Sequence, residues 1–140
     1  MGFKRALLSN ASQTASPSYA GDGLMANFNM TVFNTTTPQT LDVSQISGGN
    51  ILHAATLGAT VTYTLPTAAA LLASPAFASM DNGDSYSFVV TNAQAAAFGV
   101  IIAVGSGMIA QGNNNSLTVS AGSSRIFTLV KSSATTFNLY

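Results

Sequence analysis

The sequence contains no cysteine, no tryptophan and no glutamate, and only 6% of its 140 residues are charged. Without cysteine, the chain can form neither a disulfide nor a site that needs a thiolate. Its four Lys and Arg residues balance its four aspartates, so no net charge attracts nucleic acid or an acidic membrane surface. We therefore expect neither nucleic acid nor a membrane among its partners.

Charge is scarcest in residues 46–140, where the charged side chains are Asp81, Asp84, Arg125 and Lys131. A free-standing soluble domain normally carries charges of both signs over about a quarter or more of its surface. It also protects its sheet edges with Lys or Pro, because bare edges invite strand pairing. The scarcity predicts that neighbouring subunits, or a larger particle, cover much of this surface.

Long apolar segments are missing too. The apolar residues after Lys4 and Arg5 end at Ser9, which is short of the roughly 7–15 residues in the core of a signal peptide. The longest apolar stretch, residues 95–104, is about half of the ~20 residues that cross a membrane. We expect neither a signal peptide nor a membrane span.

Residues 1–45 are rich in Ser, Thr and Asn, contain the turn signal Gly21-Asp22-Gly23, and are predicted to form an extended N-terminal arm. Within this arm Phe28, Met30 and Val32 alternate with polar residues, which gives an extended segment one apolar face. Such a segment adds an edge strand either to its own domain or to another subunit by strand addition. The sequence does not choose between these two alternatives.

Residues 46–140 are predicted to form one β-domain. Large apolar residues alternate with Thr and Ser over several short segments, which is typical of half-buried strands. Residues 66–72 predict one short helix that ends at Pro75. Short strands at this spacing indicate a sandwich or barrel. The predicted strands are 50–52, 61–65, 85–91, 100–104, 108–110, 117–119, 125–131 and 136–140.

The alternation also predicts which side chains face the core. In the clearest strand, Tyr86, Phe88 and Val90 occupy one face, and they alternate with Ser85, Ser87 and Thr91. The same argument applied to the other strands completes the predicted core, which is Tyr63, Leu65, Tyr86, Phe88, Val90, Ile102, Phe127 and Leu129.

Residues that could carry chemistry are few. His53 is the only histidine, and the sequence around it has neither a nucleophile elbow nor an oxyanion loop. We interpret it as a structural or interface residue, with a pH-sensitive contact as the alternative. Asp81-Asn82-Gly83-Asp84 lacks the EF-hand order, and its Asn-Gly favours a turn. We predict no catalytic, metal-binding or cofactor-binding residue and no enzyme activity.

Several segments occur in an order and spacing that resemble a β-domain of tailed-bacteriophage virions, found in capsid decoration (cement) proteins and head fibres. The resemblance covers residues 46–140 and implies a small jelly-roll-like domain, commonly trimeric, that binds the outside of a capsid and holds neighbouring capsomers together. The segments are Thr64-Leu65-Pro66-Thr67-Ala68, Gly83-Asp84-Ser85-Tyr86-Ser87-Phe88 with Thr91-Asn92, Val100-Ile101-Ile102 with Gly105-Ser106-Gly107, residues 117–124, and Phe137-Asn138-Leu139-Tyr140.

Together these observations predict an all-β, jelly-roll-like sandwich or barrel with one short helix and an extended arm. The expected function is that of a structural virion protein without cofactors. This protein would be a homotrimer on the outer capsid surface, and its partner would be the major capsid protein. The alternative is a receptor- or glycan-binding module of a phage head or tail fibre. The predicted capsid-docking residues lie in the arm and are Lys4, Arg5, Phe28, Met30 and Val32.

Overall fold

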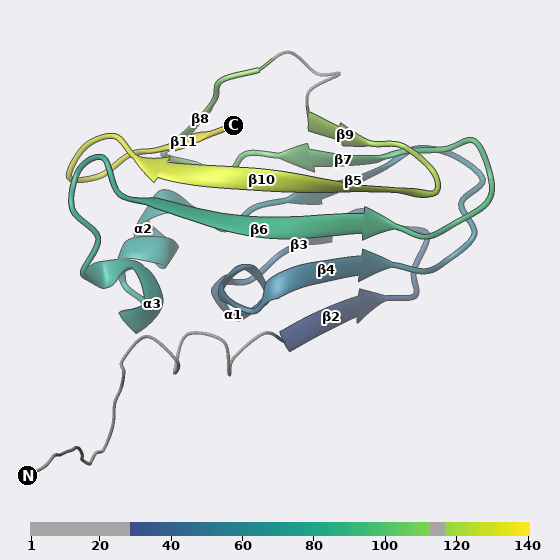
Figure 1. Ribbon diagram of the computed structural model, residues 1–140, viewed down its shortest axis with the longest axis horizontal. Helices are drawn as coiled ribbons and strands as arrows, with labels where there is room; N and C mark the ends of the chain where they lie inside the picture. Colours follow the sequence, from purple (N-terminus) through teal and green to yellow (C-terminus); the bar gives the residue numbers. More distant parts are fainter. Residues whose placement is uncertain (1–28, 113–116) are drawn as a thin grey trace, which may run out of the picture.

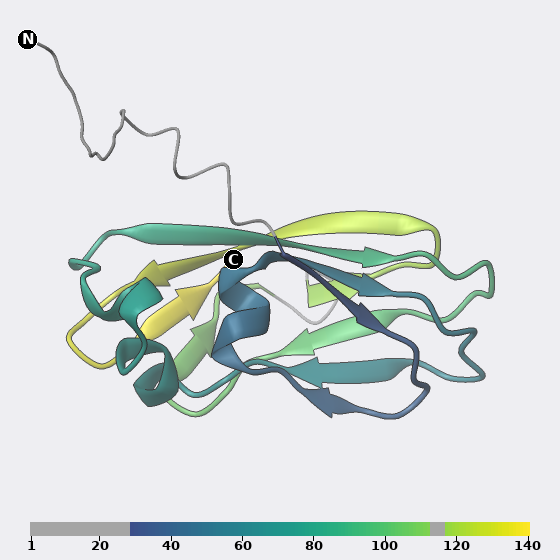
Figure 2. The ribbon, with the colours of Figure 1, turned by 90° about the horizontal axis from the view of Figure 1, so that it is seen from below.

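The computed structural model describes residues 29–112 and 117–140 and consists of two β-sheets packed face to face (Figure 1, Figure 2). The predicted all-β class is confirmed, with few and short helices. The six-stranded sheet has the order β2 (Asn29–Phe33), β4 (Gly49–His53), β6 (Ser85–Asn92), β10 (Ser123–Lys131), β11 (Phe137–Leu139) and β8 (Met108–Ala110). The four-stranded sheet has the order β3 (Gln39–Thr40), β5 (Val61–Thr64), β7 (Val100–Ala103) and β9 (Thr118–Val119).

The chain alternates between the two sheets from β2 to β10. As far as β7, each return to a sheet places the new strand beside the one formed two strands earlier, so β2, β4 and β6 are parallel, as are β3, β5 and β7. Antiparallel pairs enter with β9, β10 and β11. The predicted jelly-roll-like arrangement is not confirmed, because a jelly roll is built from antiparallel strands and several strand pairs here are parallel.

In the part of the chain that the structure describes, three short helices connect the strands, where the sequence predicted one. Helix α1 (Val43–Ser47) begins at a capping box, in which Asp42 accepts from the Gln45 amide and the Gln45 side chain accepts from the Asp42 amide. Helix α2 (Ala68–Leu72) is the predicted one and is capped by Thr67. Pro75 was predicted to end this helix, but α2 already ends at Leu72 and Pro75 has another role. It is the first residue of α3 (Pro75–Ala78), a position where the missing N–H costs nothing.

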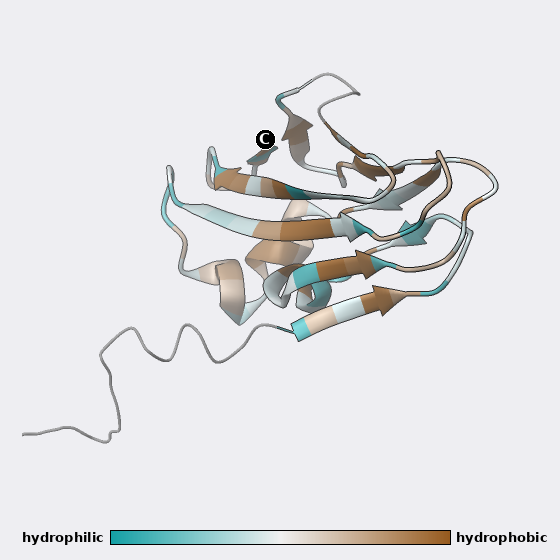
Figure 3. Cartoon of the chain, turned by 45° about the vertical axis from the view of Figure 1, so that its right-hand side comes forward, coloured by the Kyte–Doolittle hydropathy of each residue, from teal (hydrophilic) through white to brown (hydrophobic). Residues whose placement is uncertain are grey.

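The core lies between the two sheets. Apolar residues on neighbouring strands lie side by side (Figure 3), and the Phe88 and Phe127 rings stack with their centroids 5.7 Å apart. Tyr86 is only partly buried, and its hydroxyl donates to the Ser47 carbonyl over 2.7 Å. The other predicted core residues are buried; they are Tyr63, Leu65, Phe88, Val90, Ile102, Phe127 and Leu129.

The predicted boundary at residue 45 needs correction, because residues 29–45 belong to the two-sheet structure. Strand β2 pairs along its whole length with β4 of the same chain, and Leu41 is buried in the core. Sequence reasoning missed this because the polar residues around Leu41 resemble a linker. Residues 1–28 lie outside the described residues.

Candidate interaction surface

His53 is buried in the core and takes part in two hydrogen bonds. Its Nε2 lies 2.9 Å from the Ala55 carbonyl oxygen, and its Nδ1 lies 2.6 Å from the Tyr63 hydroxyl oxygen. Because a carbonyl only accepts, Nε2 carries the proton in the neutral ring and Tyr63 donates to Nδ1. Burial raises the pKa of Tyr63 to about 12, which keeps that donor proton in place. The Nδ1 bond therefore links β4 to β5, and the Nε2 bond holds the loop that follows β4.

The Asp81–Asp84 segment is a turn between α3 and β6. An Asp84 carboxylate oxygen accepts from the Asp81 amide over 2.7 Å, and Gly83 has φ +99°, which favours glycine. The Gly83 amide donates to the Lys131 carbonyl, which ties the turn to β10. Among the described residues, no group of three or more His, Cys, Asp or Glu side chains could hold a metal ion.

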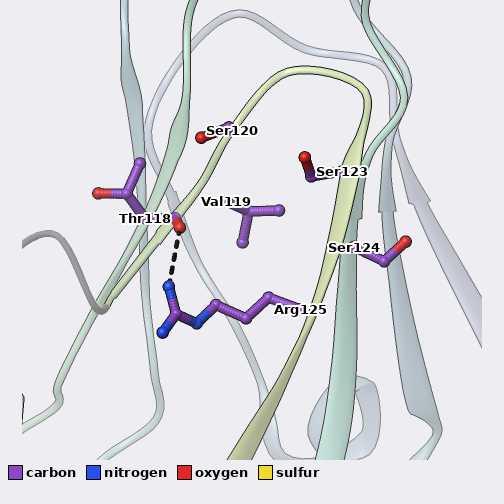
Figure 4. A pocket seen from close by; sticks show the side chains of 6 residues that line it. All are labelled: Thr118, Val119, Ser120, Ser123, Ser124 and Arg125. Carbon is purple, nitrogen blue, oxygen red and sulfur yellow. Dashed lines mark hydrogen bonds between the residues drawn. The ribbon is translucent and has the colours of Figure 1, made fainter.

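A shallow hollow lies beside the β9–β10 turn (Figure 4). Its basic group is Arg125, whose guanidinium donates to the Thr118 carbonyl over 3.4 Å. The serine hydroxyls around it point in different directions (Figure 4), and that of Ser124 bonds to Thr91 instead. Because its polar groups do not converge, this hollow is a poor candidate for a substrate site. Its lining residues are Thr118, Val119, Ser120, Ser123, Ser124 and Arg125.

The most unusual surface is the side of the six-stranded sheet that faces away from the core, which we call the outer face. Residues that lie opposite each other on paired strands project from the same side of a sheet. Met30 lies opposite Asn50, Asn50 opposite Val89, and Val89 opposite Ile126. These four side chains form a row across four strands, and its end members Met30 and Ile126 are 61% and 65% exposed.

Hydroxyl pairs flank this row on both sides. Ser87 and Thr128 share a hydrogen bond of 2.9 Å between β6 and β10. Thr91 and Ser124 share one of 2.8 Å between the same strands. Because these hydroxyls already bond to each other, a partner that covers them leaves fewer polar groups unsatisfied. The hydroxyl pairs therefore lower the desolvation cost of burying this part of the sheet against a partner.

Within the described residues, the outer face carries no charged side chain. Strand β10 contains Arg125 and Lys131, but they lie opposite the buried residues Val90 and Phe137 and therefore project from the other side. Exposed apolar patches that lack charge are typical of surfaces that bind other proteins. The outer face consists of Met30, Val32, Asn50, Leu52, Ser85, Ser87, Val89, Thr91, Ile109, Ser124, Ile126, Thr128, Val130, Asn138 and Tyr140.

Two of the predicted docking residues, Met30 and Val32, lie on the outer face, and Val32 is 52% exposed. Lys4, Arg5 and Phe28 lie outside the described residues.

Sequence reasoning missed Ile126, which is the most exposed large apolar residue among those described. The sequence contained the signal, because Ile126 lies an odd number of residues from the predicted core residues Phe127 and Leu129 in the same strand. It must therefore face the other way from Phe127.

The chain matches no family model, no curated protein and no solved structure. In the described ranges, 29–112 and 117–140, no helix combines the length and apolar character that crossing a bilayer requires.

Proposed function

We propose that this chain is a structural virion protein, a capsid decoration (cement) protein that binds the outside of a phage capsid and stabilises contacts between capsomers. The observation that carries the proposal is the outer face, which exposes Met30, Val32 and Ile126 among uncharged neighbours. A free-standing domain gains nothing from such a face, whereas a protein that coats a larger particle buries it. Residues 46–140 resemble a β-domain of tailed-bacteriophage virions, and for this reason we propose a phage capsid as the particle.

The proposed mechanism is multivalent binding to the major capsid protein. The resemblance implies a homotrimer with a jelly-roll-like domain. A trimer presents three copies of the outer face, so each later contact forms at an effective concentration that reaches about millimolar. Weak individual contacts then suffice to link neighbouring capsomers. Lys4, Arg5 and Phe28 remain proposed additional contacts from the N-terminal segment.

The alternative, a receptor- or glycan-binding module, has less support. Such a module needs aromatic side chains gathered in a groove. Among the described residues, Tyr63 is buried, Tyr86 is partly buried beneath α1, and Tyr140 is exposed at the end of the chain. These three tyrosines do not form a common binding surface.

The test is binding of the purified chain to phage shells from which it has been stripped. Ile126→Lys places a charge in the middle of the outer face, and we expect it to weaken shell binding at least tenfold. Thr40→Lys places the same charge on an exposed position of the four-stranded sheet and is the matched control, expected to bind normally. Equal binding by both variants would reject the outer face as the docking surface. Absence of the chain from purified virions would reject the proposed function.

A further inference from the structure

Among the described residues, β2 is an edge strand of the six-stranded sheet, and its side toward β4 is fully paired. The Asn29 amide donates to the Gly48 carbonyl over 3.0 Å, and the Phe33 carbonyl accepts from the Ala54 amide over 2.9 Å. In a parallel ladder, successive residues of one strand alternate between pointing both main-chain groups at the neighbour and pointing both away. Asn29, Thr31 and Phe33 therefore bond to β4. Met30 and Val32 direct their N–H and C=O groups to the open edge.

Within residues 29–112 and 117–140, this edge lacks the devices that normally prevent strand pairing. Residues 29–33 contain no charge and no proline, and β2 pairs regularly with β4, without a bulge. The two residues with outward-pointing main-chain groups also have the exposed apolar side chains of the strand, Met30 and Val32. An edge of this kind is a template for another strand.

We propose that the β2 edge pairs antiparallel with β2 of a second copy of this chain, about a two-fold axis at Thr31. In this register Met30 lies opposite Val32 of the second copy, and Val32 lies opposite Met30. Each of these is a hydrogen-bonded pair that exchanges two N–H···O=C bonds. The main-chain groups that both copies point to the edge are then all satisfied. Few registers between two copies of β2 achieve this, because Met30 and Val32 must both lie in hydrogen-bonded pairs in the same register.

The side chains fit the same register. Residues directly opposite each other project from one side of a sheet, so Met30 packs beside Val32 of the second copy on the outer face. Neither residue is charged, so an identical strand meets no repulsion. The two six-stranded sheets become one continuous sheet, and the row through Ile126, Val89, Asn50 and Met30 continues into the second copy.

This contact goes beyond the proposed function and does not depend on it. A two-fold contact is isologous and cannot by itself close a trimer. In a trimer it would be an additional contact, which joins copies that belong to different trimers. It also leaves the Met30 and Val32 side chains on the outer face, where they remain accessible to a shell.

The decisive experiment uses Thr31→Cys in the full chain. Thr31 would face Thr31 of the second copy as a non-hydrogen-bonded pair with about 4.5 Å between Cα atoms, within the roughly 4.4–6.8 Å that a disulfide spans. The chain has no other cysteine, so any disulfide joins two copies. We expect mild oxidation of a dilute solution to convert most of the protein to a covalent dimer. Thr36→Cys, in the exposed loop after β2, is the control and should cross-link at least tenfold more slowly. Equal rates would overturn the proposal.

A second variant tests the main-chain bonds directly. Val32→Pro removes an N–H that points to the open edge, so it breaks no bond to β4 and the fold should persist. We expect its two-fold association, measured by sedimentation, to weaken at least tenfold, while Val32→Ala still associates. A folded Val32→Pro that associates as tightly as the parent would overturn the proposal. So would a parent chain that stays monomeric at its highest soluble concentration, or one that captures extended peptides but not itself.

Discussion

At the scale of single residues, the core depends on a few large rings in contact across the strands. Phe88 is 1% exposed and stacks on Phe127, whereas its neighbour Ser87 points outward to Thr128. Phe88→Ala removes a buried ring and leaves a cavity, so we expect the free energy of unfolding to fall by about 3–5 kcal/mol. Ser87→Ala loses one exposed hydrogen bond and should cost about 1 kcal/mol or less. Urea unfolding of both variants checks the assignment, and similar midpoints for the two would contradict it.

The buried hydroxyl of Tyr63 makes stability depend on alkaline pH. The pKa of this group is about 12 in the folded chain and 10.0 when exposed. A raised folded pKa stabilises the fold fully below pH 10, and this contribution is lost as the pH rises through about 12. We therefore expect the unfolding midpoint of the parent to fall over this interval.

Tyr63→Phe is the matched variant for this pH dependence. It leaves the His53 Nδ1 without its donor, so we expect a loss of about 1–3 kcal/mol at neutral pH together with a weaker alkaline decline. Some decline should remain, because burial also raises the pKa of Tyr86. If parent and variant declined in parallel between pH 10 and 12, Tyr63 would not be the group responsible.

At the scale of elements, strands were predictable where large apolar residues alternate with Thr or Ser. The pattern around Tyr63 and around Phe88 locates β5 and β6 closely. Strand β3 has two residues, which is too few for an alternation to be recognised. Helix α1 could have been found from Asp42 and Gln45, whose spacing is that of a capping box.

The apolar face of β2 was predicted, but its direction was not. Alternation identifies two faces of a strand without saying which one meets the core. In the fold Phe33 turns inward, with its ring centroid 4.8 Å from that of Tyr63, and Met30 and Val32 turn outward. Phe33 has the largest apolar side chain in the strand, and it is the one that contacts the core.

Two truncations separate β2 from the segment before it. Deletion of residues 1–28 keeps every described contact, so we expect an unchanged melting temperature. Deletion of residues 1–39 removes β2, exposes Tyr63 where Phe33 covered it, and leaves the edge of β4 bare. We expect this second protein to melt several degrees lower and to aggregate more readily. Equal melting of the two truncated proteins would mean that β2 contributes nothing to the fold.

At the scale of the whole molecule, the winding of the chain was beyond sequence reasoning. Tyr63 and Ile102 both indicate buried positions, but nothing near them says that β5 and β7 lie side by side and parallel. Which strands become neighbours depends on the crossings between sheets, and these are set by packing over the whole core. The outer face was unpredictable for the same reason, because it combines residues from all six strands of the sheet.

The scarcity of charge also predicts how the molecule associates. Contacts through the outer face or the β2 edge involve no ion pair among the described residues, so salt has little to screen. We expect the association state, measured by light scattering, to be unchanged between about 0.1 M and about 1 M NaCl. Dissociation at the higher concentration would show that charged residues hold the copies together.

The position of β10 in the six-stranded sheet has a consequence for synthesis of the chain. Strand β10 lies between β6 and β11 and pairs with β6 along eight residues, yet it leaves the ribosome well after β6, because β7, β8 and β9 lie between them in the chain. Until residues 123–131 emerge, β6 has one bare edge and Phe88 lacks its stacking partner. The nascent chain is therefore most prone to aggregation after β6 has emerged and before β10 has followed it. A premature stop at Ser123, which removes β10 and β11, should yield insoluble protein rather than a smaller soluble domain.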